Sequence, residues 1–222
     1  DFDISNFQVT AFKGAGFVET WYDQSGNSKD AVQATAGSQP KIVNAGALVA
    51  DNGIDFDGSN FLAATPVSGL EGSFSMFSTS VRDSGSGYTV SISKSAANNR
   101  YFAIQEGGST SVAVPRNSTS GVSVADSVSG NNRLTFALTT SATSTSVGAL
   151  GSAVTTTTDD YGTNFTSTSG MNQIAIGLLR TVSPTGFFDG RIREILVYTS
   201  DQTDNRGAVE TNIANHYNIT LV

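Results

Sequence analysis

The 222-residue sequence contains no cysteine, one histidine and few basic residues, and these shortages exclude several classes of function. Without cysteine, the chain can form neither a disulfide nor a metal site with thiolate ligands. Its 12 basic residues are outnumbered by 19 acidic ones, which gives a net charge of −7. Because binding to a phosphate backbone requires a basic surface, we expect no nucleic acid partner.

Long apolar runs and a recognisable targeting segment are also absent. No stretch approaches the roughly 20 apolar residues that a membrane-spanning helix needs, so we expect no membrane partner. The first residues, DFDISNFQ, have neither the basic nor the apolar part of a signal peptide, and no Met precedes them. We therefore expect the chain to be a module of a larger protein.

The residue types that are abundant indicate a folded β protein. Hydrophobic residues make up 38% of the chain and are spread evenly along it, which is enough for a sizeable core. We expect one domain over residues 1–222. An acidic, Cys-free chain rich in Ser, Thr, Gly and Asn is typical of bacterial surface proteins and phage virion proteins. We therefore expect an extracellular or virion location.

Apolar residues alternate with small polar ones along most of the chain, and Gly, Asn, Asp and Ser separate the alternating runs. A period of two predicts strands with one face toward a core. The spacing of these runs favours a two-sheet antiparallel sandwich over βαβ units. The clearest runs are Tyr88, Val90 and Ile92, then Leu134, Phe136 and Leu138, then Ile174, Ile176 and Leu178.

Two segments depart from simple alternation. The stretch FFDGRIREILVYTSD has apolar residues on both faces, so we predict a central strand that is covered on both sides. The stretch LTTSATSTSVGALGSAVTTTTDD is rich in β-branched residues and has a turn from Gly148 to Gly151. This pattern predicts a hairpin with small, polar outer faces.

One short C-terminal helix completes the prediction. Val209, Ile213 and Tyr217 recur at four-residue spacing, which places them on one face of a helix. Asp201 or Thr203 is expected to cap its N-terminus. We expect the apolar stripe of this helix to pack against an edge or an end of a sheet.

Five segments of the chain occur in a characteristic order: WYDQSGNSKDAVQ, GIDFDGSNFLAA, SFSMFSTSVR, NRLTFALTTSATSTSVGALGS and FFDGRIREILVYTSDQTDNRGAVETNIANHYNI. This series resembles the LamG-like branch of the concanavalin A-like lectin/glucanase jelly rolls. The first and last segments are similar in sequence to those of bacteriophage virion or tail proteins and bacterial surface proteins. The turn YDQSGN is also similar to one in the catalytic domain of arabinofuranosidase B.

The resemblance implies an all-β fold, a two-sheet antiparallel jelly-roll sandwich of the concanavalin A-like type. In proteins with similar sequence segments, a further β segment precedes the TWYDQSG strand. The resemblance therefore implies that this chain either lacks such an element or receives it from an upstream part of the polypeptide.

The turn DQSGNSKD allows two interpretations. Asp23, Ser25 and Asn27 can hydrogen-bond to backbone groups, and Gly26 can take a positive φ, so the residues suit a tight polar turn. Asp23, Asn27 and Asp30 can instead place oxygens around Ca²⁺, the one cofactor that the sequence suggests. Because the spacing of an EF-hand is absent, we favour the structural turn and keep calcium as the alternative.

Two FDG triplets, Phe56–Gly58 and Phe188–Gly190, each place an acid at a strand end before a glycine. Such an Asp usually caps the turn that it begins. In a jelly roll, the two triplets are expected to lie near one another at a sheet edge. We favour turn formation over a shared metal site.

Catalysis is not expected. Glycosidic hydrolysis needs two carboxylates about 5 to 9.5 Å apart, and the string E-x-D-x-x-E that supplies them on jelly-roll glucanases is missing. Asp159 and Asp160 are adjacent and would point to opposite faces of a strand. Glu194 is expected to pair with Arg191 or Arg193. The neighbouring cysteines of the arabinofuranosidase site are also missing.

Sugar recognition on a β-sandwich uses aromatic faces together with Asn, Asp or Arg side chains on loops and on one sheet face. Any of the aromatic candidates can instead be an ordinary core residue. The candidate ligand-binding residues are Asn98, Asn99, Arg100, Tyr101, Arg116, Asn117, Tyr161, Asn164 and Arg180.

The sequence thus favours a non-catalytic, lectin-like module that binds glycans or host-cell surface polysaccharide. The alternatives are a structural or decoration domain that contacts other virion proteins, and a glycoside hydrolase of the arabinofuranosidase type.

Overall fold

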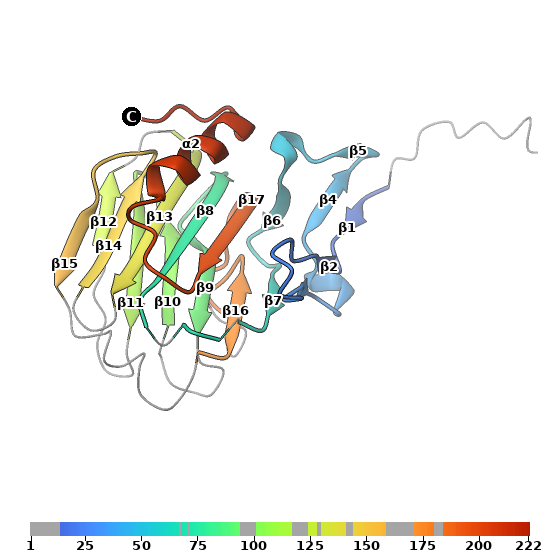
Figure 1. Cartoon of the computed structure of the whole chain (residues 1–222). Helices are drawn as coiled ribbons and strands as arrows, with labels where there is room; N and C mark the ends of the chain where they lie inside the picture. Colours follow the sequence, from blue (N-terminus) through green and yellow to red (C-terminus); the bar gives the residue numbers. More distant parts are fainter. Residues whose placement is uncertain are drawn as a thin grey trace, which may run out of the picture.

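The structure is a computed structural model that describes residues 14–66, 68–70, 72–93, 101–116, 124–127, 130–140, 144–158, 171–179 and 184–222. In these residues, two antiparallel β-sheets stack face to face, and one α-helix follows the last strand (Figure 1). The predicted fold class, an all-β two-sheet sandwich with a short C-terminal helix, is confirmed. No helix in the described part of the chain is long and apolar enough to span a membrane.

Sheet A contains nine strands of the described chain, and sheet B contains eight. In sheet A the order is β1 (Gly16–Phe17), β4 (Lys41–Asn44), β6 (Ile54–Asp57), β17 (Asp189–Tyr198), β8 (Phe74–Arg82), β13 (Asn132–Thr140), β14 (Ser144–Ala149) and β15 (Thr155–Thr158), with β5 (Ala47–Leu48) paired to β4. In sheet B the order is β12 (Val124–Ser127), β11 (Thr110–Arg116), β10 (Tyr101–Glu106), β9 (Gly87–Ser93), β16 (Gln173–Ile176), β7 (Leu62–Ala64), β3 (Ala31–Val32) and β2 (Thr20–Trp21). Two short 3₁₀-helices are η1 (Ala36–Ser38) and η2 (Ala50–Asn52).

The main core lies between the two sheets. Phe74 and Met76 of β8 pack there against Ile92 of β9 and Phe102 of β10, and all four side chains are buried. The rings of Phe74 and Phe102 meet edge to face, with centroids 5.1 Å apart. This arrangement is the expected result of strands that each turn alternate apolar side chains toward the opposite sheet.

The predicted central strand is confirmed as β17, which lies between β6 and β8. Its residue Ile192 belongs to the core between the sheets, whereas Leu196 and Tyr198 pack on the outer face of sheet A. The predicted hairpin is also confirmed, because β14 and β15 pair on either side of the turn that contains Gly151.

The helix α2 (Arg206–Tyr217) lies across the outer face of sheet A, over β13 and β8 (Figure 1). Ile213 and Ala214 pack there against Phe77 and Phe136. The predicted position at a sheet edge or end is therefore wrong, because Phe136 and its neighbours in the alternating run face this helix and not sheet B. The predicted cap is wrong as well: Asn205 precedes the helix.

The opposite face of β13 is polar and yet buried. Arg133 and Thr135 point between the sheets toward β10, and their side chains are fully enclosed. On β9, Ser91 is buried too, and its hydroxyl donates to the carbonyl oxygen of Leu179. Half-buried strands with one solvent face were expected, and these strands are instead covered on both sides.

The two ends of the sandwich differ in what they contain. We call one the loop end: it holds Ser93, which pairs with both Tyr101 and Gln173. We call the other the network end: it holds Glu106 of β10 and Arg133 of β13. The strands β9, β10 and β13 run from one end to the other, so side chains at the two ends have separate surroundings.

Candidate functional site

A polar pocket of about 570 Å³ opens at the loop end, and we call it the end pocket. Pairing of β7 with β16, which sets Ala64 opposite Ile174, brings the segment after β7 next to the residues that precede β16. The turn that follows β2 supplies the remaining wall. The lining residues are Asn27, Lys29, Thr65, Pro66, Ser68, Met171 and Asn172.

The turn beside this pocket is held by the carboxylate of Asp23. Its Oδ1 accepts the backbone N–H of Ser25 at 2.8 Å, and its Oδ2 accepts the Ser25 hydroxyl at 2.9 Å and the backbone N–H of Lys29 at 3.0 Å. These hydrogen bonds, from Ser25 first, lower the pKa of Asp23. Gly26 has a φ of 82°, which suits a residue without a Cβ.

The other two residues of the calcium alternative also take part in hydrogen bonds of this turn. Asp30 Oδ1 accepts the backbone N–H of Asp23 at 2.8 Å, and the Asn27 side-chain amide donates to the Ser25 hydroxyl at 2.8 Å. Within the described residues, no group of three or more His, Cys, Asp or Glu side chains is arranged to hold a metal ion. The hydrogen bonds are those of the structural turn, and calcium binding stays an untested prediction.

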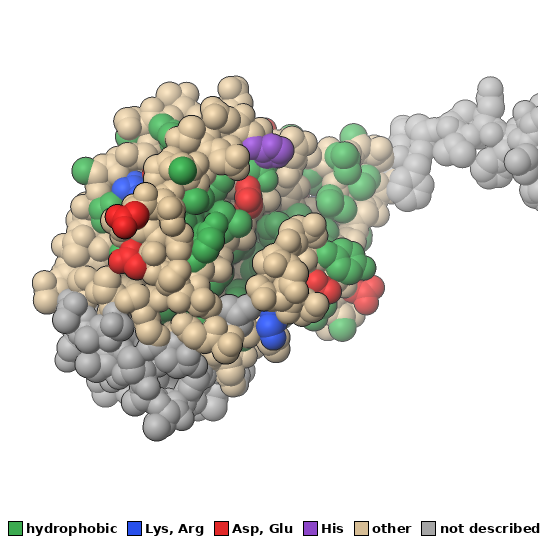
Figure 2. Space-filling model, in the orientation of Figure 1, with side chains coloured by type: hydrophobic (Ala, Val, Ile, Leu, Met, Phe, Trp, Pro, Cys, Tyr) green, Lys and Arg blue, Asp and Glu red, His purple; other side chains and the backbone are tan. Residues whose placement is uncertain are grey.

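A second hollow of about 650 Å³, the edge groove, lies on the other side of this turn. The large apolar side chains around it are exposed: Phe17 by 52%, Tyr22 by 67% and Leu48 by 74%. Figure 2 shows hydrophobic side chains at the surface of the part of the molecule that carries β1, β4 and β5. The lining residues are Phe17, Val18, Glu19, Thr20, Trp21, Tyr22, Gln24, Ile42, Leu48, Val49, Asn52, Gly53, Ile54 and Arg193.

The two FDG triplets are neighbours, as expected, because Asp57 of β6 pairs with Asp189 of β17. Their expected place at a sheet edge is wrong, because both strands lie in the interior of sheet A. Asp57 Oδ1 accepts the backbone N–H of Ser59 at 3.0 Å and its hydroxyl at 2.6 Å. Asp189 accepts the Ser84 hydroxyl. Burial alone would raise the pKa of Asp57, but the hydrogen bonds of Ser59 and Asn60 lower it. Both acids therefore order turns.

The arginines of β17 pair with residues other than the expected one. Arg191 contacts Asp51 at 3.1 Å and Asp83 at 2.6 Å, and Arg193 lies 3.7 Å from Asp51. Glu194 does not pair with either arginine and instead raises the pKa of Tyr217, after the larger effect of burial. The expected pairing of Glu194 is therefore wrong, because Asp51 and Asp83 are the carboxylates that engage these arginines.

Most of the predicted sugar-binding residues lie outside the described part of the chain. Tyr101 is described: it is 4% exposed and packs with Ala103, Val112 and Leu179 on the outer face of sheet B. Its ring is therefore not available for stacking on a sugar at the surface. Arg116 is described only by its backbone, which pairs with Tyr101. Outside the described residues are Asn98, Asn99, Arg100, Asn117, Tyr161, Asn164 and Arg180.

Two of the predicted sugar-binding segments, one with Asn98 to Arg100 and one with Tyr161 and Asn164, are flanked by described residues that lie close together at the loop end. Ser93 precedes the segment with Asn98 to Arg100, and it pairs with Gln173, close to where the segment with Tyr161 and Asn164 ends. Asn172 of the end pocket donates its backbone N–H to the Ser93 carbonyl at 3.1 Å. The structure thus brings the anchors of the predicted loops next to the end pocket.

Sequence reasoning missed most of the end pocket. For Lys29 the sequence did contain a signal of a binding role, because this residue lies two positions after Asn27, in the same polar turn as the candidate calcium ligands. The sequence contained no such signal for the pocket residues Thr65, Ser68 and Met171, because only the pairing of β7 with β16 brings them close to the turn.

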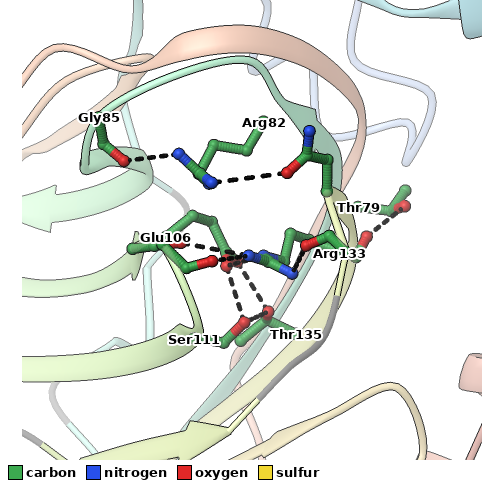
Figure 3. A network of polar contacts seen from close by, with 11 residues as sticks. Thr79, Arg82, Gly85, Glu106, Ser111, Arg133 and Thr135 are labelled. Atoms are coloured by element: carbon green, nitrogen blue, oxygen red, sulfur yellow. Dashed lines mark hydrogen bonds and ion pairs between the residues drawn. The ribbon is translucent and has the colours of Figure 1, made fainter.

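One carboxylate with a strongly raised pKa, Glu106, lines neither hollow. Glu106 is fully buried between the sheets, and its two carboxylate oxygens each accept one hydroxyl, from Ser111 and Thr135, at 2.7 Å (Figure 3). Burial raises its pKa to about 7, an effect larger than the opposing ones of the hydroxyls and of Arg133. With no solvent access, this group cannot meet a substrate, so its role is structural.

Arg133 completes this network at the network end (Figure 3). Its Nε lies 3.4 Å from Glu106 Oε2 without hydrogen-bond geometry. Its terminal nitrogens donate to the carbonyls of Gly130, Gly107 and Gly108, the last two at 3.2 and 3.0 Å. The guanidinium thus fixes the turn between β10 and β11 to β13 of the opposite sheet.

No family model matches the sequence, and no curated protein matches it. Solved structures do match. The CBM40 of the Ruminococcus gnavus IT-sialidase bound to α2,3-sialyllactose is 15% identical, with a TM-score of 0.53 over 63% of this chain and 82% of that chain. A structure of botulinum neurotoxin type C, described as interacting with two ganglioside molecules, is 12% identical, with a TM-score of 0.54 over 91% and 50%.

The leech intramolecular trans-sialidase is 17% identical, with a TM-score of 0.54 over 73% of this chain and 27% of that enzyme. At these identities, the likeness shows the fold alone, a β-sandwich of the lectin-like kind. The resemblance to jelly-roll lectins is therefore supported at the level of the fold, while no LamG family match accompanies it.

Proposed function

We propose that this chain is a non-catalytic, lectin-like module that binds a glycan in the end pocket. The observation that carries the proposal is the lining of the pocket, which combines residues that have amide, hydroxyl and ammonium groups with the apolar residues Pro66 and Met171. A sugar presents the same two kinds of surface, hydroxyl groups and apolar C–H patches. Ser93 and Gln173, which precede or follow two of the predicted recognition segments in the sequence, pair beside this pocket.

The absence of catalysis is part of this proposal. No Asp or Glu is among the described residues that line the end pocket, and Glu19 is the one carboxylate among those that line the edge groove. Two opposed carboxylates are needed for most glycoside hydrolysis. Neither hollow supplies them from its described lining.

The structural neighbours and the composition support the wider context. A CBM40 bound to sialyllactose and a neurotoxin described as interacting with gangliosides share this fold, which shows that the sandwich is compatible with glycan binding. The acidic, Cys-free composition favours an extracellular bacterial or virion protein, with a cell-surface polysaccharide as partner.

A glycan array tests the proposal. The wild-type protein is expected to bind at least one glycan class, and Ser68→Trp is expected to abolish this binding because the indole fills the end pocket. Ser68 is exposed, so the melting temperature should not change. Thr155→Trp, an exposed residue of β15 at the far edge of sheet A, is the matched control and should bind normally. A wild-type protein with no signal on the array would contradict the proposal.

A second candidate function, contact with another protein, is favoured by the edge groove. Exposed apolar side chains grouped around one hollow are typical of protein interfaces. The test is the assembly state in solution. Protein contact predicts a defined oligomer or complex that Leu48→Glu dissociates, while Val154→Glu, which replaces an exposed valine of the β14–β15 turn, leaves it intact. A monomer at all concentrations, with no complex, would exclude self-association through the groove.

A further inference from the structure

We infer that the end pocket selects a sugar that carries an oxyanion, a carboxylate or a sulfate, and that the Lys29 ammonium recognises it. This inference rests on the proposed glycan binding and specifies its substrate class. It depends on three features of the described residues: Lys29 has no counter-ion among them, the nearby carboxylates hydrogen-bond to the backbone of the turn, and no acid is among those that line the pocket.

Lys29 differs from the arginines whose side chains are described. Arg133, Arg191, Arg193 and Arg206 each lie within 4.0 Å of a carboxylate oxygen. Arg82 has no such ion pair among the described residues, but its guanidinium donates to the Gly85 carbonyl and to the amide oxygen of Asn131. Lys29 has no such partner in the described part of the chain, although its side chain is partly buried in the wall of a pocket. In a protein with a net charge of −7, an unpaired ammonium in a hollow is available to an external anion.

The turn itself explains why Lys29 has no internal partner. The Asp23 carboxylate accepts the backbone N–H of Lys29 and both donors of Ser25, and Asp30 accepts the backbone N–H of Asp23. These carboxylates are thus oriented toward the backbone of the turn, and neither forms an ion pair with Lys29. The same hydrogen bonds fix the point from which the Lys29 side chain extends, so the ammonium is confined to the region of the pocket.

The rest of the pocket is compatible with an anionic sugar. Its described lining contains no carboxylate that would repel an anion, and it includes the apolar residues Pro66 and Met171, which suit the face of a sugar ring. The edge groove differs in its charged residues. Glu19 lines it, and its cation, Arg193, is already engaged by Asp51 and by the amide oxygen of Asn132.

The test is a calorimetric titration with matched pairs of sugars. The probes are methyl glucuronide against methyl glucoside, N-acetylneuraminic acid against N-acetylmannosamine, and galactose 6-sulfate against galactose. The wild-type protein is expected to bind at least one acidic sugar about tenfold more tightly than its neutral partner, the effect of one charge-assisted hydrogen bond. The carboxylate and sulfate probes distinguish the two sources of the oxyanion.

Variants assign the effect to Lys29. Lys29→Ala should remove the preference for the acidic sugar, and Lys29→Arg should keep most of it. Lys41→Ala is the matched control, because it removes the same charge from β4, where the lysine acts on Asp55 and Asp57. It should leave the preference unchanged.

The outcomes separate the inference from the proposed function. Equal affinity for acidic and neutral sugars, or an acidic preference that survives in Lys29→Ala, would overturn the inference while leaving glycan binding intact. No binding of any sugar in these titrations and no signal on the glycan array would overturn both.

Discussion

Arg133 and Lys29 are cations at opposite ends of one sandwich, and they differ in what surrounds them. Arg133 is enclosed between the sheets, beside Glu106 and three backbone carbonyls. Lys29 lies in the wall of an open pocket without a carboxylate partner in the described chain. We infer from this difference that Arg133 stabilises the fold, whereas Lys29 is available to bind a ligand.

The largest expected effect comes from breaking the enclosed pair. At a pH above 7, where Glu106 is ionised, Glu106→Ala leaves the Arg133 guanidinium buried without its counter-ion, and the free energy of unfolding should fall by about 3–5 kcal/mol. Urea denaturation measures this change. Replacing both residues together, as Glu106→Leu with Arg133→Met, should cost much less, because no charge remains buried. A single variant as stable as the wild type would show that the pair does not hold the sheets together.

The second effect concerns pH. Burial raises the pKa of Glu106 to about 7 from a usual value of 4.5, so between these values the native state holds a proton that the unfolded chain has released. This contribution to stability is complete below pH 4.5 and is lost as the pH rises to 7, on the order of 3 kcal/mol. Denaturation curves at several pH values should show the decline, and Glu106→Gln should remove it. A pH dependence that is the same in both proteins would assign it to other groups.

The third prediction is that removing the Lys29 cation has almost no effect on stability, in contrast to removing Arg133. Lys29→Ala removes a cation that pairs with no described carboxylate, so the free energy of unfolding should change by less than about 0.5 kcal/mol. Arg133→Ala is the contrasting variant and should be strongly destabilising. A large loss of stability in Lys29→Ala would mean that this lysine is a structural residue.

The smallest effect is expected from chelation. Because Asp23 and Asp30 already accept hydrogen bonds from the turn, removal of calcium by EDTA should leave the melting temperature unchanged. A metal bound only to the native state would raise the midpoint. A melting temperature that falls on adding EDTA and recovers with Ca²⁺ would establish the calcium alternative.

Local patterns in the sequence were sufficient to predict the architecture. Alternation with period two predicted the strands, the two apolar faces of β17 predicted its central place, and the spacing of Val209, Ile213 and Tyr217 predicted α2. These signals are local, since each depends on residues a few positions apart. They are therefore visible without knowing which strands pair.

What the sequence could not reveal depends on contacts between distant segments. The polar residues of β13 looked like a solvent face, but Glu106 of the opposite sheet encloses them. Tyr101 looked like a surface aromatic, but Leu179 covers it. The end pocket is likewise formed by three segments that only strand pairing brings together. Site residues were thus harder to predict than strands.

The turn from Tyr22 to Asp30 lies between the two hollows and contributes lining residues to both. Tyr22 and Gln24 stand on the side of the edge groove, and Asn27 and Lys29 on the side of the end pocket. The Asp23 carboxylate stabilises this turn by accepting the backbone N–H groups of Ser25 and Lys29. An insertion or deletion there would remodel both hollows at once, so neither can be redesigned by loop grafting without altering the other.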